Sequence, residues 1–247
     1  MTHSPLAYRP GIDGMRAIAV LGVVLYHAGF GPPAGFVGVD VFFVISGFLI
    51  TSQLEMELAA SGRIDLAAFY ARRARRLLPT LALVLAVSLV GCFFILSPYG
   101  ELTSALQSVA ASIVFGANIF FQYTTGDYFG PNVNHLPLLH LWSLGVEEQY
   151  YLLWPVALLL SRRLPINARR GVFALCALGS LAFAEWAIYQ GSQAAFYAMP
   201  SRWWELSLGA LIAWAPTPEK RVGQWEGWAG IVIVLVAMAV PTQHFPG

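Results

Sequence analysis

Charged residues are scarce in this chain. Only 11% of its 247 residues are charged, whereas a soluble globular domain has roughly 25%. There is a single lysine, and the net charge of +1 provides no overall field that would attract a nucleic acid. The composition therefore argues against a soluble domain and against a nucleic-acid partner.

Cysteines are also few, since the chain has only Cys92 and Cys176, and both lie in apolar runs. Such cysteines usually behave as small hydrophobic residues, so we expect neither a disulfide framework nor a metal site. A cleavable secretory signal is not expected either, because the first apolar run, residues 17–26, leads into His27 and a Gly/Pro loop instead of a small-residue cleavage site. We expect this run to remain as a first transmembrane helix.

Hydrophobic residues make up 57% of the chain and gather in runs close to the roughly 20 residues that cross a bilayer. There are seven such runs, of which the last two are short for a span, and residues 101–121 form an eighth candidate. The seven cover residues 12–30, 36–54, 79–96, 139–160, 171–189, 203–215 and 228–240. We therefore predict an all-α fold, a polytopic transmembrane helix bundle of seven or eight apolar segments in one domain over residues 1–247.

Basic residues predict the orientation of this bundle, because lysine and arginine accumulate in short cytoplasmic loops. Five arginines lie between the second and third runs, whereas the loops at 31–35 and 97–100 have no basic residue. This pattern places the N-terminus in the cytoplasm. We favour a segment 101–121 that does not fully cross, because a crossing there would put the arginines at 162–170 outside. Residues 127–140 then form an outer loop.

Ionisable residues at membrane depth are costly and usually mark function. Arg16 and His27 lie on the first run, about 16 Å apart along a helix and on nearly the same face. The imidazole is a candidate general base, because histidine titrates near neutral pH; the alternative is an interfacial histidine bonded to a loop carbonyl. Asp13 is a pairing partner for Arg16, and Asp40 is an acidic residue on the second run.

Four arginines lie just ahead of the third run, namely Arg72, Arg73, Arg75 and Arg76. Guanidinium groups bind phosphate in a bidentate manner and keep their charge when partly desolvated. This arginine cluster is therefore a candidate site for the phosphates of a nucleotide-linked donor such as a coenzyme A thioester. Setting the topology and binding anionic lipid are the alternative roles.

A third polar feature lies in the run 139–160, where His140, Ser143 and Glu147 recur along one helical face. Glu148 is rotated about 100° from Glu147. These side chains are candidates to line a polar site within an otherwise apolar span. A purely structural polar seam between helices is the alternative.

These segments resemble the bacterial integral-membrane acyltransferases of acyltransferase family three, which O-acetylate surface polysaccharides and related acceptors. The matching blocks are residues 8–20 continuing to Tyr26-His27, residues 35–51, the arginine cluster and residues 140–155. In that family an arginine, ten residues and then a histidine are regarded as catalytic, and this pattern falls on Arg16 and His27. The family's arginine motif, associated with donor binding, falls on the arginine cluster.

The resemblance implies a membrane O-acyltransferase of the bacterial inner membrane. Its donor would be acetyl-CoA or another acyl-CoA on the cytoplasmic side, and its acceptor a hydroxyl of a cell-envelope carbohydrate or lipid-linked molecule. His27 would deprotonate this hydroxyl or form an acyl-histidine, while Glu147, ranked above Asp40, would orient the imidazole. Family members have more spans than this chain, so we expect it to be truncated at its C-terminus.

Two other functions fit the same residues. A proton-coupled or solute transporter would use Arg16, His27, Asp40 and Glu147 along a path through the bundle, although the sequence shows no inverted repeat. A structural or lipid-binding protein would tolerate the loss of both Arg16 and His27. The sequence does not identify the acceptor, the acyl chain length or the oligomeric state.

Overall fold

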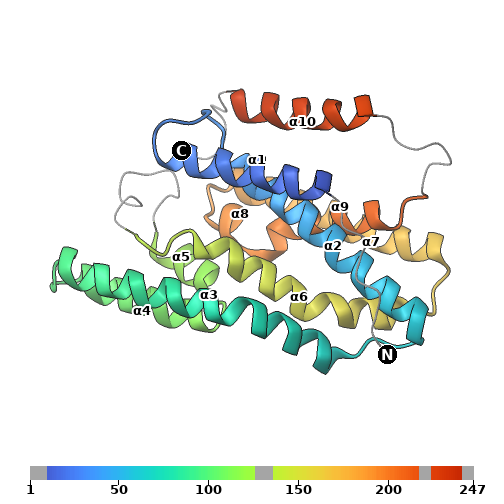
Figure 1. Ribbon diagram of the computed structural model, residues 1–247, viewed down its shortest axis with the longest axis horizontal. Helices are drawn as coiled ribbons and strands as arrows, with labels where there is room; N and C mark the ends of the chain where they lie inside the picture. The colour runs from blue at the N-terminus through green and yellow to red at the C-terminus, as the bar shows by residue number, and fades with distance from the viewer. Residues whose placement is uncertain (1–9, 126–135, 217–223, 241–247) are drawn as a thin grey trace. The chain divides into compact units, whose positions relative to one another are not determined.

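The computed structural model describes residues 10–125, 136–216 and 224–240, and every regular element in these ranges is a helix (Figure 1). The helices are α1 (Pro10–His27), α2 (Val37–Ser61), α3 (Leu66–Ile95), α4 (Glu101–Ile113), α5 (Ala117–Thr124), α6 (Leu141–Ser161), α7 (Ile166–Tyr189), α8 (Ala194–Tyr197), α9 (Met199–Ala213) and α10 (Gln224–Ala239). The predicted all-α class is confirmed for the described part of the chain.

Within the described ranges, three helices, α2, α3 and α7, are long and apolar enough to cross a bilayer, which indicates an integral membrane protein. The predicted count of seven or eight apolar segments is not confirmed. Polar residues interrupt α6 at Glu147, Glu148 and Gln149. The 15 residues of α9 extend only about 22 Å, which is less than the roughly 30 Å hydrocarbon core.

Helix α3 begins at Leu66, whereas the sequence predicted a span starting at residue 79. Asp65 caps its N-terminus, because the carboxylate accepts a hydrogen bond of 2.9 Å from the backbone N–H of Ala68. The following alanines and arginines are good helix formers, so the helix runs without a break into the apolar segment, with Pro79 inside it. The arginine cluster therefore lies on a helix and not in a loop, which corrects the prediction.

The described residues separate into two compact units, each assembled from segments far apart in the sequence. Unit 1 contains α1, α2 up to Glu57, the first half of α7, α9 from Trp204 and α10. Figure 1 shows α10 beside α1, and the backbone carbonyl of Met238 accepts a 2.9 Å hydrogen bond from the N–H of Ala34.

Glycines let the neighbouring helices of unit 1 approach α2 closely. A Cβ atom at Gly38 would overlap the backbone carbonyl of Ala19 on α1, and one at Gly47 would overlap that of Leu206 on α9. The α2–α9 contact is reciprocal, since a Cβ atom at Gly209 would overlap the α2 backbone. Small residues of this kind are typical where membrane helices pack backbone against backbone.

Unit 2 contains α3, α4, α5, α6 and α8, together with the end of α7 and the start of α9. Helices α3 and α4 lie side by side as a hairpin (Figure 1). The interior is aromatic: the rings of Tyr150 and Trp154 stack with centroids 4.9 Å apart, and Trp203 lies 4.8 Å from Tyr150. This core places α6 at the centre of unit 2.

The segment 101–121 forms two short helices in place of one, because the backbone breaks between α4 and α5. Phe115 at the break has a φ of 54°, which is uncommon for a residue other than glycine. The side chain of Gln149 donates to the carbonyl of Phe115 (3.1 Å) and to the side-chain oxygen of Asn118 (2.8 Å). At about 20 Å, α4 alone is too short to cross the bilayer core.

The polar residues of α4, namely Glu101, Ser104, Ser108 and Ser112, recur at helical spacing and form a polar stripe, of which Glu101 is exposed and the last two serines face protein. Ser108 and Ser112 are buried, and their hydroxyls donate to carbonyls of their own helix, on Ala105 and Ser108 respectively, each at 2.7 Å. Glu101 accepts from the backbone N–H of Ser97 at 2.9 Å. These contacts account for the stripe by packing. The predicted outer loop, residues 127–140, lies outside the described residues up to position 135.

Candidate active site

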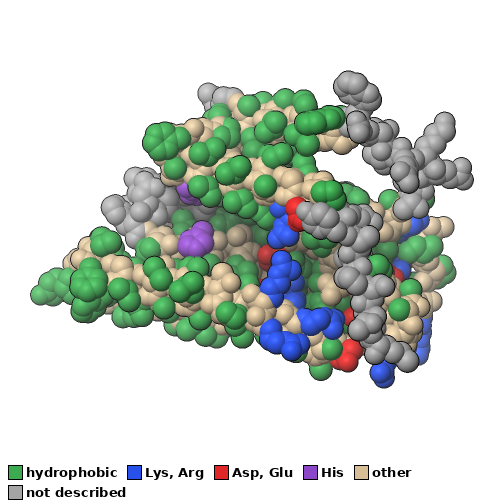
Figure 2. Space-filling view, viewed as in Figure 1, with side chains coloured by type: hydrophobic (Ala, Val, Ile, Leu, Met, Phe, Trp, Pro, Cys, Tyr) green, Lys and Arg blue, Asp and Glu red, His purple; other side chains and the backbone are tan. Residues whose placement is uncertain are grey.

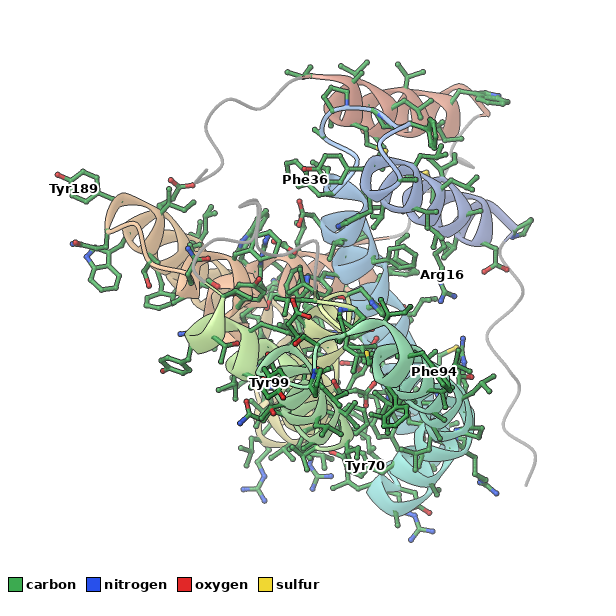
Figure 3. All side chains as sticks on the ribbon, turned by 90° about the vertical axis from the view of Figure 1, so that its left-hand side faces the viewer. Arg16, Phe36, Tyr70, Phe94, Tyr99 and Tyr189 are labelled. Atoms are coloured by element: carbon green, nitrogen blue, oxygen red, sulfur yellow. The ribbon has the colours of Figure 1, made fainter. Side chains whose placement is uncertain are left out.

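Helix α1 carries Arg16 and His27, as the sequence predicts, with His27 as its last residue. Arg16 projects from the side of α1 that is turned away from α10 (Figure 3). Ala19 and Gly22 are buried on the face that packs against α2 and α10. Because α1 is helical throughout, the two ionisable groups keep the predicted axial separation of about 16 Å.

The hydrogen bond of His27 defines which ring nitrogen is basic. Nδ1 lies 2.9 Å from the backbone carbonyl of Val23, one turn earlier. A carbonyl oxygen only accepts, so Nδ1 carries the proton, and Nε2 is the unprotonated nitrogen of the neutral ring. The ring also makes an edge contact with Tyr26, 5.2 Å between centroids. The imidazole therefore has the tautomer that a general base acting through Nε2 requires.

The two aspartates of unit 1 occupy ordinary helical positions. Asp13 lies 3.9 Å from the guanidinium of Arg16, and both side chains are substantially exposed, so this pair contributes little to stability. Asp40 lies in the first turn of α2, where the helix dipole favours a carboxylate. Its position is that of a helix-terminal acid and does not require a catalytic role.

The arginine cluster on α3 presents its members in two directions. Arg72, Arg75 and Arg76 are exposed, whereas Arg73 is partly buried. Figure 2 shows the basic side chains gathered over the N-terminal half of α3. The Nε of Arg75 donates to the backbone carbonyl of Ala71 at 3.2 Å, which leaves the end of its guanidinium at the surface. Three of the four predicted donor ligands thus share one accessible helical face.

Arg73 contacts α6. Its guanidinium makes an ion pair and hydrogen bond with Glu148 and lies 3.5 Å from the centroid of the Tyr151 ring. The hydroxyl of Tyr151 donates to Glu147 at 2.6 Å. Nearby, the hydroxyl of Tyr70 donates to the backbone carbonyl of Leu152 at 2.9 Å. The arginine cluster and the acidic residues of α6, which were predicted separately from the sequence, are therefore connected in one network.

The polar face predicted on α6 is only partly present. His140 is exposed and precedes the helix, and the hydroxyl of Ser143 donates to the backbone carbonyl of His140 at 3.2 Å. Glu147 is partly buried and bonded to Tyr151. Through Tyr151, Glu147 is joined to the network that contains Arg73 and Glu148.

The predicted residues divide between the two units. Asp13, Arg16, His27 and Asp40 belong to unit 1, and the arginine cluster with the α6 residues belongs to unit 2.

Unit 1 also contains a polar network that was not predicted from the sequence. One carboxylate oxygen of Glu55 on α2 forms an ion pair with the guanidinium of Arg169 and accepts a hydrogen bond from the indole N–H of Trp214, each at 2.9 Å. Arg169 is also stacked 4.8 Å from the Trp214 ring, and Arg170 donates to the Trp214 carbonyl. In the sequence, the arginines at 162–170 served only to predict the topology. No sequence pattern indicated that Glu55 is their partner. The network fastens α2, α7 and the end of α9 together.

Comparison with known proteins adds family evidence to this geometry. A family model described as an acyltransferase domain matches residues 9–246. Two relatives are named O-acetyltransferase OatA, from Staphylococcus aureus strains NCTC 8325 / PS 47 and COL. Each is 36% identical over 226 residues, which cover 89% of this chain and 37% of the relative. The chain thus spans little more than a third of these relatives. No solved structure matches it.

Proposed function

This chain belongs to acyltransferase family three, and from that premise we propose that it is the membrane part of an O-acyltransferase. The proposed donor is acetyl-CoA or another acyl-CoA, and the proposed acceptor is a hydroxyl group of a cell-envelope carbohydrate or lipid-linked molecule. We place the enzyme in the bacterial inner membrane, with the N-terminus and the donor in the cytoplasm, because the arginines follow the positive-inside rule.

The observation that carries the proposal is the state of His27. Its Nδ1 is held by the Val23 carbonyl, so the neutral ring has an unprotonated Nε2. Nε2 would remove the proton from the acceptor hydroxyl while the hydroxyl oxygen attacks the thioester carbonyl carbon. The carbon–sulfur bond then breaks, and the proton passes from the imidazolium to the thiolate of coenzyme A. In the alternative route, Nε2 itself attacks the thioester carbonyl carbon and forms an acyl-histidine, which the acceptor hydroxyl then cleaves.

The other residues have supporting roles in this proposal. The exposed arginines of α3 bind the donor's phosphates, since guanidinium groups match phosphate geometry and retain their charge. Arg16 provides a second cation for the donor. Glu147 is the carboxylate proposed to stabilise the protonated imidazole, as a carboxylate does in other acyl-transfer sites.

The test compares acyl transfer by the complete protein in membranes with transfer by His27→Gln. The glutamine side chain is polar and similar in length but has no basic nitrogen, so we expect transfer from labelled acetyl-CoA to envelope glycans to fall about 10²–10⁴-fold. Arg63→Ala serves as a control, because Arg63 is an exposed residue before α3. A near-normal rate in His27→Gln, with protein levels matched, would remove His27 from the mechanism.

A further inference from the structure

The four arginines of α3 do not form one surface. Arg72, Arg75 and Arg76 are three and four residues apart, which places them on one helical face, and all three are exposed. Arg73 is rotated about 100° from Arg72, and its side chain is only 26% exposed. A helix can present Arg73 to a neighbouring helix and the other three to water.

The inward direction of Arg73 is stabilised by two contacts with α6. Glu148, whose side chain is 13% exposed, accepts from one guanidinium nitrogen. The flat guanidinium lies against the face of the Tyr151 ring, 3.5 Å from its centroid, an arrangement that favours a cation. Tyr151 in turn donates to Glu147 at 2.6 Å. Arg73 is thus connected to Glu147 through the ring and hydroxyl of one tyrosine.

A donor phosphate would be poorly placed at Arg73. Its positive charge is already balanced by Glu148, and a phosphate oxygen brought to the same guanidinium would approach the Glu148 carboxylate as a like charge. Repulsion of this kind is strong where water is largely excluded. Breaking the Arg73–Glu148 pair to admit a phosphate would also leave a carboxylate partly buried without its partner.

We propose that Arg73 is a positioning residue that fixes Glu147 on α6 through Glu148 and Tyr151, and that the donor's phosphates are bound by Arg72, Arg75 and Arg76 alone. This inference rests on the proposed function, because it assigns separate roles within that function's arginine cluster. If the inference is correct, replacing Arg73 lowers the rate of acyl transfer once the donor is bound. Replacing Arg75 instead weakens the affinity for the donor.

The experiment measures kcat and KM for acetyl-CoA in the complete protein, with variants that remove the charge but keep a polar side chain. Arg73→Gln, Glu148→Gln and the double variant form one cycle, and Arg75→Gln and Arg63→Gln are the matched arginine controls. We expect each single change in the pair to lower kcat about tenfold or more, with KM within about twofold and the double variant no worse than the poorer single one.

Two further variants, together with the two arginine controls, sharpen the result. Arg73→Lys keeps a cation for Glu148 and should recover most of the kcat lost in Arg73→Gln. Tyr151→Phe keeps the ring but removes the hydroxyl that binds Glu147, so kcat should fall while KM is unchanged. Arg75→Gln should raise KM about tenfold with little change in kcat, whereas Arg63→Gln should change neither.

The opposite pattern overturns the proposal. The buried Nε of Arg73 has no hydrogen-bond partner among the residues described, so a direct role of Arg73 in donor binding is the alternative that the kinetics must test. If Arg73→Gln raises KM tenfold while Glu148→Gln leaves kinetics unchanged, or if the losses in the double variant multiply, then Arg73 is a donor ligand.

Direct binding of coenzyme A separates failure of this inference from failure of the proposed function. If the unaltered protein transfers no acyl group, the function is wrong. Arg73 can still be tested by titrating coenzyme A onto the detergent-purified protein. Binding that is unchanged in Arg73→Gln and weakened in Arg75→Gln supports the division of roles, and binding weakened in Arg73→Gln refutes it.

Discussion

Replacing Gly47 by alanine should push α2 and α9 apart. The new Cβ atom would overlap the backbone carbonyl of Leu206, and a carbonyl held in a helix cannot rotate away as a side chain can. Overpacking of a well-packed contact costs about 1–3 kcal/mol, and we expect the upper end here. Alanine's better helix propensity returns roughly 1 kcal/mol. The net loss in the free energy of unfolding is then about 2 kcal/mol.

The matched control is Gly91→Ala on α3. No heavy atom lies within 4 Å of a Cβ atom built there, so only the propensity gain of roughly 1 kcal/mol applies. For a chain of this size, 1 kcal/mol shifts the melting temperature by about 2–4 °C. Thermal unfolding of the detergent-purified variants should therefore show Gly47→Ala about 4–8 °C below the unaltered protein and Gly91→Ala equal to it or higher. Equal melting temperatures for the two variants would refute the close approach of α2 and α9.

Other predictions concern the polar networks. Asn118→Leu should cost about 1–3 kcal/mol, because it removes the 2.8 Å acceptor of the partly buried Gln149 amide; additive losses in the Asn118→Leu/Gln149→Leu double variant would show that the two amides do not act as a pair. Glu55→Ala should cost roughly 3 kcal/mol by leaving the guanidinium of Arg169 buried without its carboxylate, and an unchanged melting temperature would contradict this network. Arg75→Ala should raise KM for acetyl-CoA about tenfold at low ionic strength and less in high salt; a KM that does not respond at either salt concentration would exclude a phosphate contact.

The sequence located most helices of the bundle, because apolar runs bounded by Gly/Pro loops are strong signals. Helices α1, α2 and α6 lie close to the predicted runs. The start of α3 was missed because a span was sought by hydropathy, and residues 66–78 are too rich in arginine to register. The break at Phe115 was also missed, since it depends on side chains of α6 that bind the exposed backbone.

Prediction of the site was more limited, because a single sequence reports which residues share a helical face but not which helix that face meets. It identified Arg16 and His27 on one helix, yet not the hydrogen bond that selects the basic nitrogen of His27. The sequence also grouped Arg73 with the other three arginines of the cluster. Only the contact of Arg73 with α6 distinguishes it from them. Glu55 and Arg169 are more than a hundred positions apart, so nothing in the sequence joined them.

The length of α3 bears on where a water-soluble substrate can meet this protein. Thirty residues make a rod of about 45 Å, which exceeds the hydrocarbon thickness by roughly 15 Å. This excess corresponds to nearly three helical turns, or about ten residues. The N-terminal part of α3, which carries the exposed guanidinium groups, is therefore long enough to extend into the headgroup layer. The proposed nucleotide-linked donor would bind there without entering the hydrocarbon core, in competition with the anionic lipids of the headgroup layer. Turnover should consequently fall as the fraction of anionic lipid in reconstituted vesicles is increased.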